Sequence, residues 1–529
     1  MLSKSKFVKG MQCSKLLWLD KYKKEALQAS PAFLKKAQSG QEVGQLARDL
    51  FPGGKEIAYN PDDMAGMAVR TKELINQGVK IIYEATFEYQ GILVMVDILE
   101  IEGNRVVLNE VKSSTNIYRD SKAQHPKEEY LWDLGIQYYV LAGLGYKVEG
   151  AYLICLDKTY MREGALDLKG LFLKNDFLEF VKDFQSAISA HLAGMNQVLA
   201  SQQEPDVMIG KHCSAPHECS AKPYCWEEQQ GLVGHEHIFA LARHGFGNKI
   251  MKLYQDRKIF FKDLEEEDIQ SLTRSQRMQV KHTKTNTPHI EKDAIQEFLA
   301  TLKYPLYHLD FETYQPAIPP FDGVRPYMQI PFQYSIHIEY GDGRIEHKEF
   351  LAECGNDGRL ELAQRLVKDI PSDACVLAYS SGFEQSTLKE LAHFFAPHVN
   401  FDTNKLQNLK AFLDAHATQL PQIAKDLLLI RSNTLDLMTP FQHGHYYDPK
   451  MGGSHSIKSV LPALVPNFEK AYKDLELVHN GEEAMQAYAQ MPHMSKEEQE
   501  KTKKALLEYC KLDTLAMVEV LGVLKRAVE

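Results

Sequence analysis

The alternation of apolar and polar residues along the N-terminal part of the chain predicts a mixed α/β domain. Residues 81–114 contain apolar runs separated by two glycine-containing turns, a pattern typical of three consecutive strands joined by hairpins. Apolar residues then recur at helical spacing over 128–146, and a further strand is expected at 150–156. The order helix, three strands, helix, strand indicates a mixed α/β fold.

The C-terminal part begins with an apolar strand at 305–314 and continues with a strand, a turn and a helix at 374–391. A clear amphipathic helix follows at 506–521. Between the two parts, short polar helices are predicted, ending in a polar linker at 281–287. We therefore expect an α/β protein with three segments: an N-terminal domain over 1–228, a helical connector over 229–300 and a C-terminal domain over 301–529.

Composition and charge narrow the class of protein. Hydrophobic content of 44% and charged content of 25% over 529 residues exclude global disorder, collagen and coiled coil. The formal charge of −10 argues against a uniformly basic nucleic-acid binder, but not against a local basic groove, because a phosphate responds to the local field. No stretch resembles a signal peptide or a membrane span, so we expect a cytoplasmic protein with reduced thiols and no membrane partner.

Charged residues interrupt the predicted strands of the N-terminal domain. Asp97 ends one strand, and Glu110 and Lys112 lie two residues apart on the next, so the latter two share a face. A hairpin can bring Asp97 beside them, and Gln137 follows on the next helix. Two carboxylates can hold Mg²⁺ or Mn²⁺, and a lysine can offset charge on a phosphoryl transition state. The set predicts a catalytic site for phosphodiester hydrolysis, with Asp97 and Glu110 as metal ligands; solvated charges at strand ends are the alternative.

This D…E-x-K pattern resembles the PD-(D/E)xK nucleases, specifically the RecB-like branch, in which a helix carrying Gln follows the motif. The resemblance implies a restriction-endonuclease-like fold. Val96 replaces the usual proline, and residues 39–54 resemble the branch's first motif without its metal-binding histidine. Glu42, Glu84 and Glu88 are the candidates for that missing ligand.

Four of the eight cysteines surround the predicted nuclease core. Cys213, Cys219 and Cys225 lie in one polar segment after it, and Cys13 precedes it. Four thiolates suit either Zn²⁺ or an iron–sulfur cluster. The other four cysteines are expected as small core residues: Cys155, Cys354, Cys375 and Cys510.

The same placement of cysteines resembles AddB-type helicase–nucleases and the CRISPR spacer-acquisition nuclease of the RecB-like branch. There, one cysteine before the core and three after it hold a [4Fe–4S] cluster. The resemblance implies a structural [4Fe–4S] cluster here. The spacing between Cys213 and Cys219 departs from the usual triplet and keeps Zn²⁺ as the alternative.

The C-terminal domain carries a second set of acids on three predicted elements. Asp310 and Glu312 lie two residues apart on the strand and share a face, and Glu384 begins a helix. Tyr509 and Asp513, at i and i+4, share one face of the terminal helix. Four converging acids can bind two Mg²⁺ or Mn²⁺ ions about 4 Å apart, and a tyrosine hydroxyl can orient the attacking water. The five residues predict a second catalytic site, with the four acids as metal ligands.

This order of motifs resembles the DEDD exonucleases of the DnaQ-like, ribonuclease-H-like fold, in the tyrosine subclass. The match covers about 303–529 and implies 3′→5′ exonuclease activity. Glu384 stands where the family carries Asp, and Asp436 is the fallback ligand. The segment 314–331, rich in Pro and aromatic residues, is expected as a loop near this site, where it either stacks unpaired bases or packs against the protein.

The layout as a whole resembles an uncharacterised bacterial family that joins these two nuclease modules. It implies a nuclease acting on DNA that is single-stranded or has free ends, in DNA repair or defence against foreign DNA. A ribonuclease and a non-catalytic nucleic-acid-binding module are the alternatives, since nothing in the acid motifs reads a 2′-hydroxyl. The chain has no G-x4-G-K-[ST] motif, so an associated helicase would be a separate protein.

Overall fold

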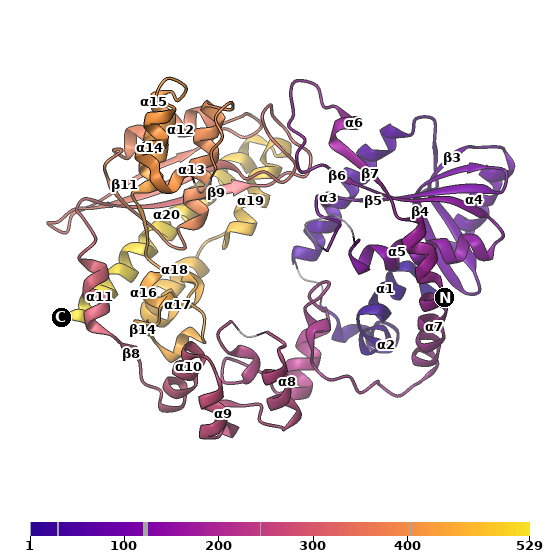
Figure 1. The fold of residues 1–529 in the computed structure, drawn as a ribbon, viewed down its shortest axis with the longest axis horizontal. Helices are drawn as coiled ribbons and strands as arrows, with labels where there is room; N and C mark the ends of the chain where they lie inside the picture. Colours follow the sequence, from indigo (N-terminus) through magenta and orange to yellow (C-terminus); the bar gives the residue numbers. More distant parts are fainter. Residues whose placement is uncertain (1, 29–30, 120–124, 244, 403–404) are drawn as a thin grey trace. The chain divides into compact units, whose positions relative to one another are not determined.

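The computed structural model describes residues 2–28, 31–119, 125–243, 245–402 and 405–529. The chain forms two units, each of mixed α/β structure (Figure 1). Unit 1 comprises Met1–Val233 and Pro316–Met328, and unit 2 comprises Gly234–Gln315 and Gln329–Glu529. The segment 229–300, expected as a connector, therefore falls within unit 2 from Gly234 onward.

Unit 1 is built on a seven-stranded sheet in the order β2-β3-β4-β5-β6-β7, with β1 paired to β4. The strands are β1 (Leu2–Ser3), β2 (Lys55–Glu56), β3 (Ile81–Tyr89), β4 (Ile92–Glu102), β5 (Arg105–Lys112), β6 (Lys147–Leu156) and β7 (Phe172–Asp176). The predicted hairpins over 81–114 are confirmed, since β3, β4 and β5 pair in antiparallel fashion. The predicted helix is α5 (Glu128–Gly143), the crossover between the parallel strands β5 and β6.

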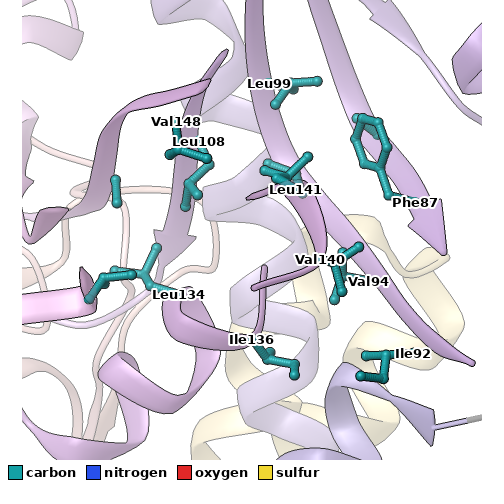
Figure 2. Packing of buried hydrophobic residues seen from close by; sticks show 14 of the residues in the cluster. Phe87, Ile92, Val94, Leu99, Leu108, Leu134, Ile136, Val140, Leu141 and Val148 are labelled. Atoms are coloured by element: carbon teal, nitrogen blue, oxygen red, sulfur yellow. The ribbon is translucent and has the colours of Figure 1, made fainter. Parts of the chain in front are cut away.

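The helices of unit 1 bury the apolar side chains of this sheet. Figure 2 shows Leu134 and Val140 of α5 among the side chains of Val94, Leu99 and Leu108. The other helices are α1 (Lys4–Gln12), α2 (Ser14–Tyr22), α3 (Pro31–Ala47), α4 (Met64–Asn76), α6 (Leu168–Leu171) and α7 (Leu178–Ala200). This packing fixes the position of the strand ends that carry the acids.

Unit 2 contains a five-stranded sheet in the order β11-β10-β9-β12-β13. The strands are β9 (Leu306–Tyr314), β10 (Ile330–Glu339), β11 (Ile345–Leu351), β12 (Cys375–Ala378) and β13 (Thr434–Asp436). The first three pair in antiparallel fashion, and β9, β12 and β13 run parallel. The strand predicted at 305–314 is confirmed as β9, and the strand and helix predicted within 374–391 are confirmed as β12 and α13 (Gly382–Phe395).

Helices cover both faces of the unit 2 sheet. Its helices are α8 (Asn248–Gln255), α9 (Glu266–Ser271), α10 (Arg274–Thr285), α11 (Lys292–Leu299), α12 (Arg359–Asp369), α13 (Gly382–Phe395), α14 (Leu409–Ala415), α15 (Gln422–Ser432), α16 (Thr439–Gln442), α17 (Ile457–Leu464), α18 (Glu469–Lys473), α19 (Gly481–Gln490) and α20 (Lys496–Val528). The predicted terminal helix is α20, which begins at a capping box between Ser495 and Glu498 and packs on β9 and β10. The helices α12, α13 and α15 pack together with apolar side chains of β9 and β10.

The segment that precedes β9 is part of unit 2 rather than a separate linker. The strand β8 (His289–Ile290) pairs with β14 (Tyr446–Tyr447), far along the chain. The prediction of a linker at 281–287 was wrong, because α10 continues to Thr285 and ends at Asn286, which has a left-handed φ of 48°. The end of α10 was missed because two of its three buried residues are glutamines, which give no apolar periodicity: Gln276, Gln279 and Val280.

The Pro-rich segment 316–328 packs within unit 1. Arg162 donates hydrogen bonds to the carbonyls of Pro319 and Pro320 at 3.0 and 2.8 Å, and Tyr327 donates to the carbonyl of Ser113. The side chains of Ala317, Ile318 and Tyr327 join an apolar cluster of that unit. Of the two alternatives for this segment, the structure has the packed loop.

In the part of the chain that the structure describes, no helix has the length and apolar character needed to cross a bilayer.

Candidate functional site

The strand β9 of unit 2 directs alternate side chains to opposite faces of its sheet. Leu309 and Phe311 pack with α12, α13 and α15, so Asp310 and Glu312 face α20 on the other side. The sulfur of Cys510 on α20 lies 3.6 Å from Oδ2 of Asp310. One potential ligand atom from each of Asp310, Glu312 and Cys510 lies within 4.8 Å of the others. Cys510 is buried as expected, but it also borders the acids.

The helix α20 brings Asp513 and Tyr509 to the same place. The hydroxyl group of Tyr472 donates a hydrogen bond to the Asp513 carboxylate, and Tyr509, one turn earlier on α20, interacts with the same carboxylate electrostatically. Gly481, at the start of α19, approaches Glu312 closely, since a Cβ there would lie 3.5 Å from its Oε2. Tyr472 was missed by sequence reasoning because it lies on a short helix with no motif of its own.

Glu384 lies in the first turn of α13, as predicted, and is only 3% exposed. Its Oε2 is buried without a hydrogen-bond partner in the described structure. The fallback ligand Asp436 lies at the end of β13, where its Oδ1 accepts the amides of Ser380 and Met438, each at 2.9 Å. Burial, together with the nearby Asp436, raises the pKa of Glu384 to about 8.

The acids of unit 2 oppose one another's ionisation. Burial raises the pKa of Asp310 well above its usual value, and repulsion from Asp513, Glu312 and Glu384 adds to this. The pKa of Glu312 is raised in the same way, and burial raises that of Asp513 to about 6. Without a counter-charge the cluster holds protons, which a divalent cation would replace.

In unit 1, β4 and β5 bring together the residues that the sequence grouped. The Asp97 carboxylate accepts the amide of Val111 at 2.7 Å. Glu110 is 1% exposed, and its oxygens accept from Nζ of Lys112 at 2.6 Å and Nε2 of Gln137 at 2.8 Å. All four predicted residues of this site therefore lie in one hydrogen-bonded group or directly beside it.

Two further residues complete the unit 1 group, and sequence reasoning missed both. Nζ of Lys4 lies 2.9 Å from Glu110 and 3.2 Å from Asp133, and Lys112 also binds Asp133. Burial, then repulsion by Asp133 and Asp97, raises the pKa of Glu110 to about 7. Asp133 could have been noticed as an acid within the apolar helix 128–146, whereas nothing in the sequence marks Lys4.

Of the three candidates for the missing unit 1 ligand, two lie beside Asp97 and Glu110 and one does not. Glu42 and Glu84 line the same hollow of about 1060 Å³ as Asp97 and Glu110. Glu84 has a left-handed φ of 56° and pairs with Arg48 at 3.0 Å. Glu88 instead accepts the amide of Gly91 in the β3–β4 turn. The structure thus brings Glu42 and Glu84 to the site and leaves Glu88 outside it.

The four predicted cluster cysteines, Cys13, Cys213, Cys219 and Cys225, line one small hollow of about 20 Å³ in unit 1. His212 and Lys15 also line it. Hydrogen bonds with Cys13 and Cys213 raise the pKa of His212 to about 10, and burial raises the thiol pKa of Cys219 and Cys225. The donor set fits a thiolate-bound metal, whose charge would stabilise the thiolates.

The similarities to known proteins described here cover only part of the chain. Residues 307–456 match a domain of unknown function, DUF2779. The match includes Asp310, Glu312 and Glu384 and ends before Tyr509 and Asp513. The chain is also similar to the uncharacterised protein UU173 of Ureaplasma parvum serovar 3, with 24% identity over 202 residues. That similarity covers 37% of this chain and 26% of the relative, so the matched region spans about a quarter of the relative's length.

Proposed function

We propose that the protein is a metal-dependent nuclease that hydrolyses phosphodiester bonds of DNA, with 3′→5′ exonuclease activity in unit 2. The observation that carries this proposal is the group of Asp310, Glu312 and Cys510, whose potential ligand atoms lie within 4.8 Å of one another, with Asp513 and Glu384 near enough to repel Asp310 electrostatically. Buried like charges are costly unless a cation neutralises them. The orphaned Oε2 of Glu384 and the raised pKa values therefore support a site for Mg²⁺ or Mn²⁺.

The sheet of unit 2 supports a ribonuclease-H-like, DEDD-type domain. Its order places three antiparallel strands beside two parallel ones, with the acid-bearing β9 in the centre. The last helix, α20, supplies the remaining acid and the tyrosine to the same face. This is the arrangement that the DEDD resemblance implies.

Each side chain has a distinct part in the proposed reaction. The acids would hold the ions, which polarise the phosphate and lower the pKa of water when bound. Tyr509, next to Asp513, would orient the attacking water. Lys458 on α17 acts electrostatically on Glu312 and Asp513 and would offset negative charge of the scissile phosphate.

The test is hydrolysis of end-labelled single-stranded DNA by the full-length protein with Mg²⁺ or Mn²⁺. We expect release of mononucleotides from the 3′ end, lost in Asp310→Asn and Asp513→Asn. Asp414→Asn, at an exposed position on α14, is the matched control. Unchanged hydrolysis in both acid variants would refute the assignment. RNA of the same sequence runs in parallel, and preferential cleavage of RNA would replace the DNA assignment by a ribonuclease.

For unit 1 we propose a RecB-like PD-(D/E)xK domain whose site cuts or grips the strand. The grouping of Asp97, Glu110, Lys112 and Gln137 supports this. DNA repair and defence against foreign DNA are the settings that suit such an enzyme, with a separate helicase as a partner.

We further propose that the four cysteines hold a structural [4Fe–4S] cluster, and the support is that they line one hollow. Anaerobically purified protein should be brown and contain iron that Cys13→Ser lowers, whereas Cys354→Ser should not. A colourless protein containing stoichiometric zinc would contradict the cluster and favour Zn²⁺.

A further inference from the structure

Unit 2 contains two adjoining hollows that the acid site does not account for. Their volumes are about 500 and 650 Å³, within the range of ligand-binding sites. They share five lining residues: Ala242, Arg243, Gly453, Ser454 and His455. The two hollows therefore form one cleft, bounded by α10, the segment 239–243 and the turn that precedes α17.

The charged side chains that line this cleft are mainly lysines and arginines, in contrast to the net charge of −10 of the whole chain, whereas burial lowers the pKa of the lining His282 and His455. The lysines and arginines are Arg243, Arg274, Lys281 and Lys458, and the histidines are His282, His289, His443 and His455. Glu291 is the acid among the lining residues, and it pairs with Arg274 at 3.2 Å. The positive charges extend along both hollows, which suits a chain of phosphates better than a single anion.

Buried polar groups hold the wall of the cleft in place. Gln279 of α10 is 1% exposed; its Oε1 accepts the amide of Ala242 at 2.7 Å and its Nε2 donates to the carbonyl of Ala240 at 2.9 Å. Arg243 follows with a left-handed φ of 50°, which is unusual for a residue with a side chain. Gly453 lies against Gln279 so closely that a Cβ would come within 2.4 Å of its amide. The cleft is thus a preformed feature of the fold.

Two residues that line one end of the cleft also interact with the acids. Ser380 and Lys458 line the second hollow. The amide of Ser380 donates to Asp436, and Lys458 acts electrostatically on Glu312 and Asp513. The other hollow has an apolar lining as well, which includes Met278, Phe441 and Met451.

We propose that this cleft binds the sugar–phosphate backbone of a single DNA strand whose 3′ end lies among the acids of unit 2. The inference rests on the proposed nuclease function and names the path of its substrate. Arg243, Lys281 and Lys458 contact phosphates, and the apolar lining accepts bases, as in other sites for single strands. A short substrate would reach the acids without filling the cleft, whereas a longer strand would use it.

Two measurements on the full-length protein test this path. The first is the affinity for a fluorescent single strand of about 20 nucleotides, measured in EDTA so that no strand is cut. Arg243→Glu/Lys281→Glu should weaken binding at least tenfold. Arg243→Ala should lower the slope of log affinity against log salt by about 0.7, as expected for one lost phosphate contact on a single strand. The matched control is Lys410→Glu/Lys504→Glu, two exposed lysines that line neither hollow, and it should change affinity less than about twofold.

The second measurement compares kcat/KM for the same strand with that for a thymidine 5′-monophosphate nitrophenyl ester. The charge reversal in the cleft should reduce the strand-to-ester ratio at least tenfold, while the control leaves that ratio unchanged. Equal losses in the cleft and control variants, in affinity or in the ratio, would overturn the proposal. If no variant hydrolyses either substrate, the nuclease proposal fails, but the affinity and its salt dependence still decide whether the cleft binds a strand.

Discussion

The two acid groups of this protein neutralise their charges in different ways. In unit 1, Glu110 and Asp133 are bonded to Lys4 and Lys112 of the same chain. In unit 2, among the described residues, Asp310, Glu312, Glu384 and Asp513 form no salt bridge with a lysine or arginine. Buried carboxylates need a counter-charge or a proton. Unit 1 supplies lysines, whereas in our proposal unit 2 relies on bound cations. We therefore expect unit 2 to be the more strictly metal-dependent of the two.

The largest effect expected from this difference is on catalysis. Chelation by EDTA and the substitution Asp310→Asn should each reduce release of mononucleotides by about a thousandfold or more. Asp97→Asn should leave most of that release, because we assign the reaction to unit 2. Initial rates on end-labelled single strands provide the measurement. A loss with Asp97→Asn as large as with Asp310→Asn would abolish the distinction between the two sites.

A smaller effect is expected on the stability of unit 1. Lys4→Met leaves Glu110 and Asp133 with one lysine instead of two, and should lower the free energy of unfolding by about 2–4 kcal/mol. The control is Lys6→Met on the same helix, since the one-third exposed Lys6 lies 3.6 Å from Asp20, which also pairs with Lys9, and should matter by less than about 1 kcal/mol. Peptide-resolved hydrogen exchange over α1 and β5 measures both. Equal effects would mean that Lys4 does not balance the acid group.

Neutralising one acid should have opposite signs in the two units. In EDTA at neutral pH, Glu312→Gln removes a repelled acid and should stabilise unit 2 by about 1–2 kcal/mol. In unit 1, Lys112 and Lys4 hold the pKa of Asp133 below its usual value, so Asp133→Asn leaves both lysines with one partner fewer and should destabilise the unit. Hydrogen exchange in β9 and β5 reports the two units separately. Destabilisation by both variants would show that the unit 2 acids are already neutralised by the protein.

The repulsion among the unit 2 acids should also make the stability of the metal-free protein depend on pH. The folded-state pKa of Glu384 is raised from 4.5 to about 8, and that of Asp513 from 3.8 to about 6. At pH values between the unfolded-state and folded-state pKa of each acid, the folded protein binds more protons than the unfolded chain. The free energy of unfolding therefore falls as pH rises from about 4 to 8. Hydrogen exchange in α20 should become faster over that range in EDTA, beyond the intrinsic increase, and saturating Mg²⁺ should remove the difference. A flat profile in EDTA would contradict the assigned repulsion.

Local patterns predicted those parts of the molecule that depend on neighbours in sequence. The two-residue spacing of Asp310 and Glu312 placed both on one face of β9, and the four-residue spacing of Tyr509 and Asp513 placed both on one face of α20. The capped helix α20 and the hairpins over 81–114 follow from the same kind of signal.

Contacts between distant segments could not be predicted in this way. Lys4 and Glu110 are in contact although 106 residues separate them in sequence, and Cys510 and Asp310 although 200 do. No periodic pattern in the sequence predicts either contact. The basic cleft likewise combines α10 with the turn before α17, and buried glutamines rather than apolar residues fix its wall. Such contacts result from tertiary packing alone.

The most direct test of the central claim is calorimetric titration of the full-length protein with Mn²⁺. The claim is that unit 2 depends on divalent cations more strictly than unit 1, whose acids are already paired with lysines. We predict that Asp97→Asn binds Mn²⁺ with nearly the stoichiometry and affinity of the unaltered protein, and that Asp310→Asn/Asp513→Asn loses this binding while keeping its fold. Retention of full Mn²⁺ binding by the Asp310→Asn/Asp513→Asn variant would contradict the claim.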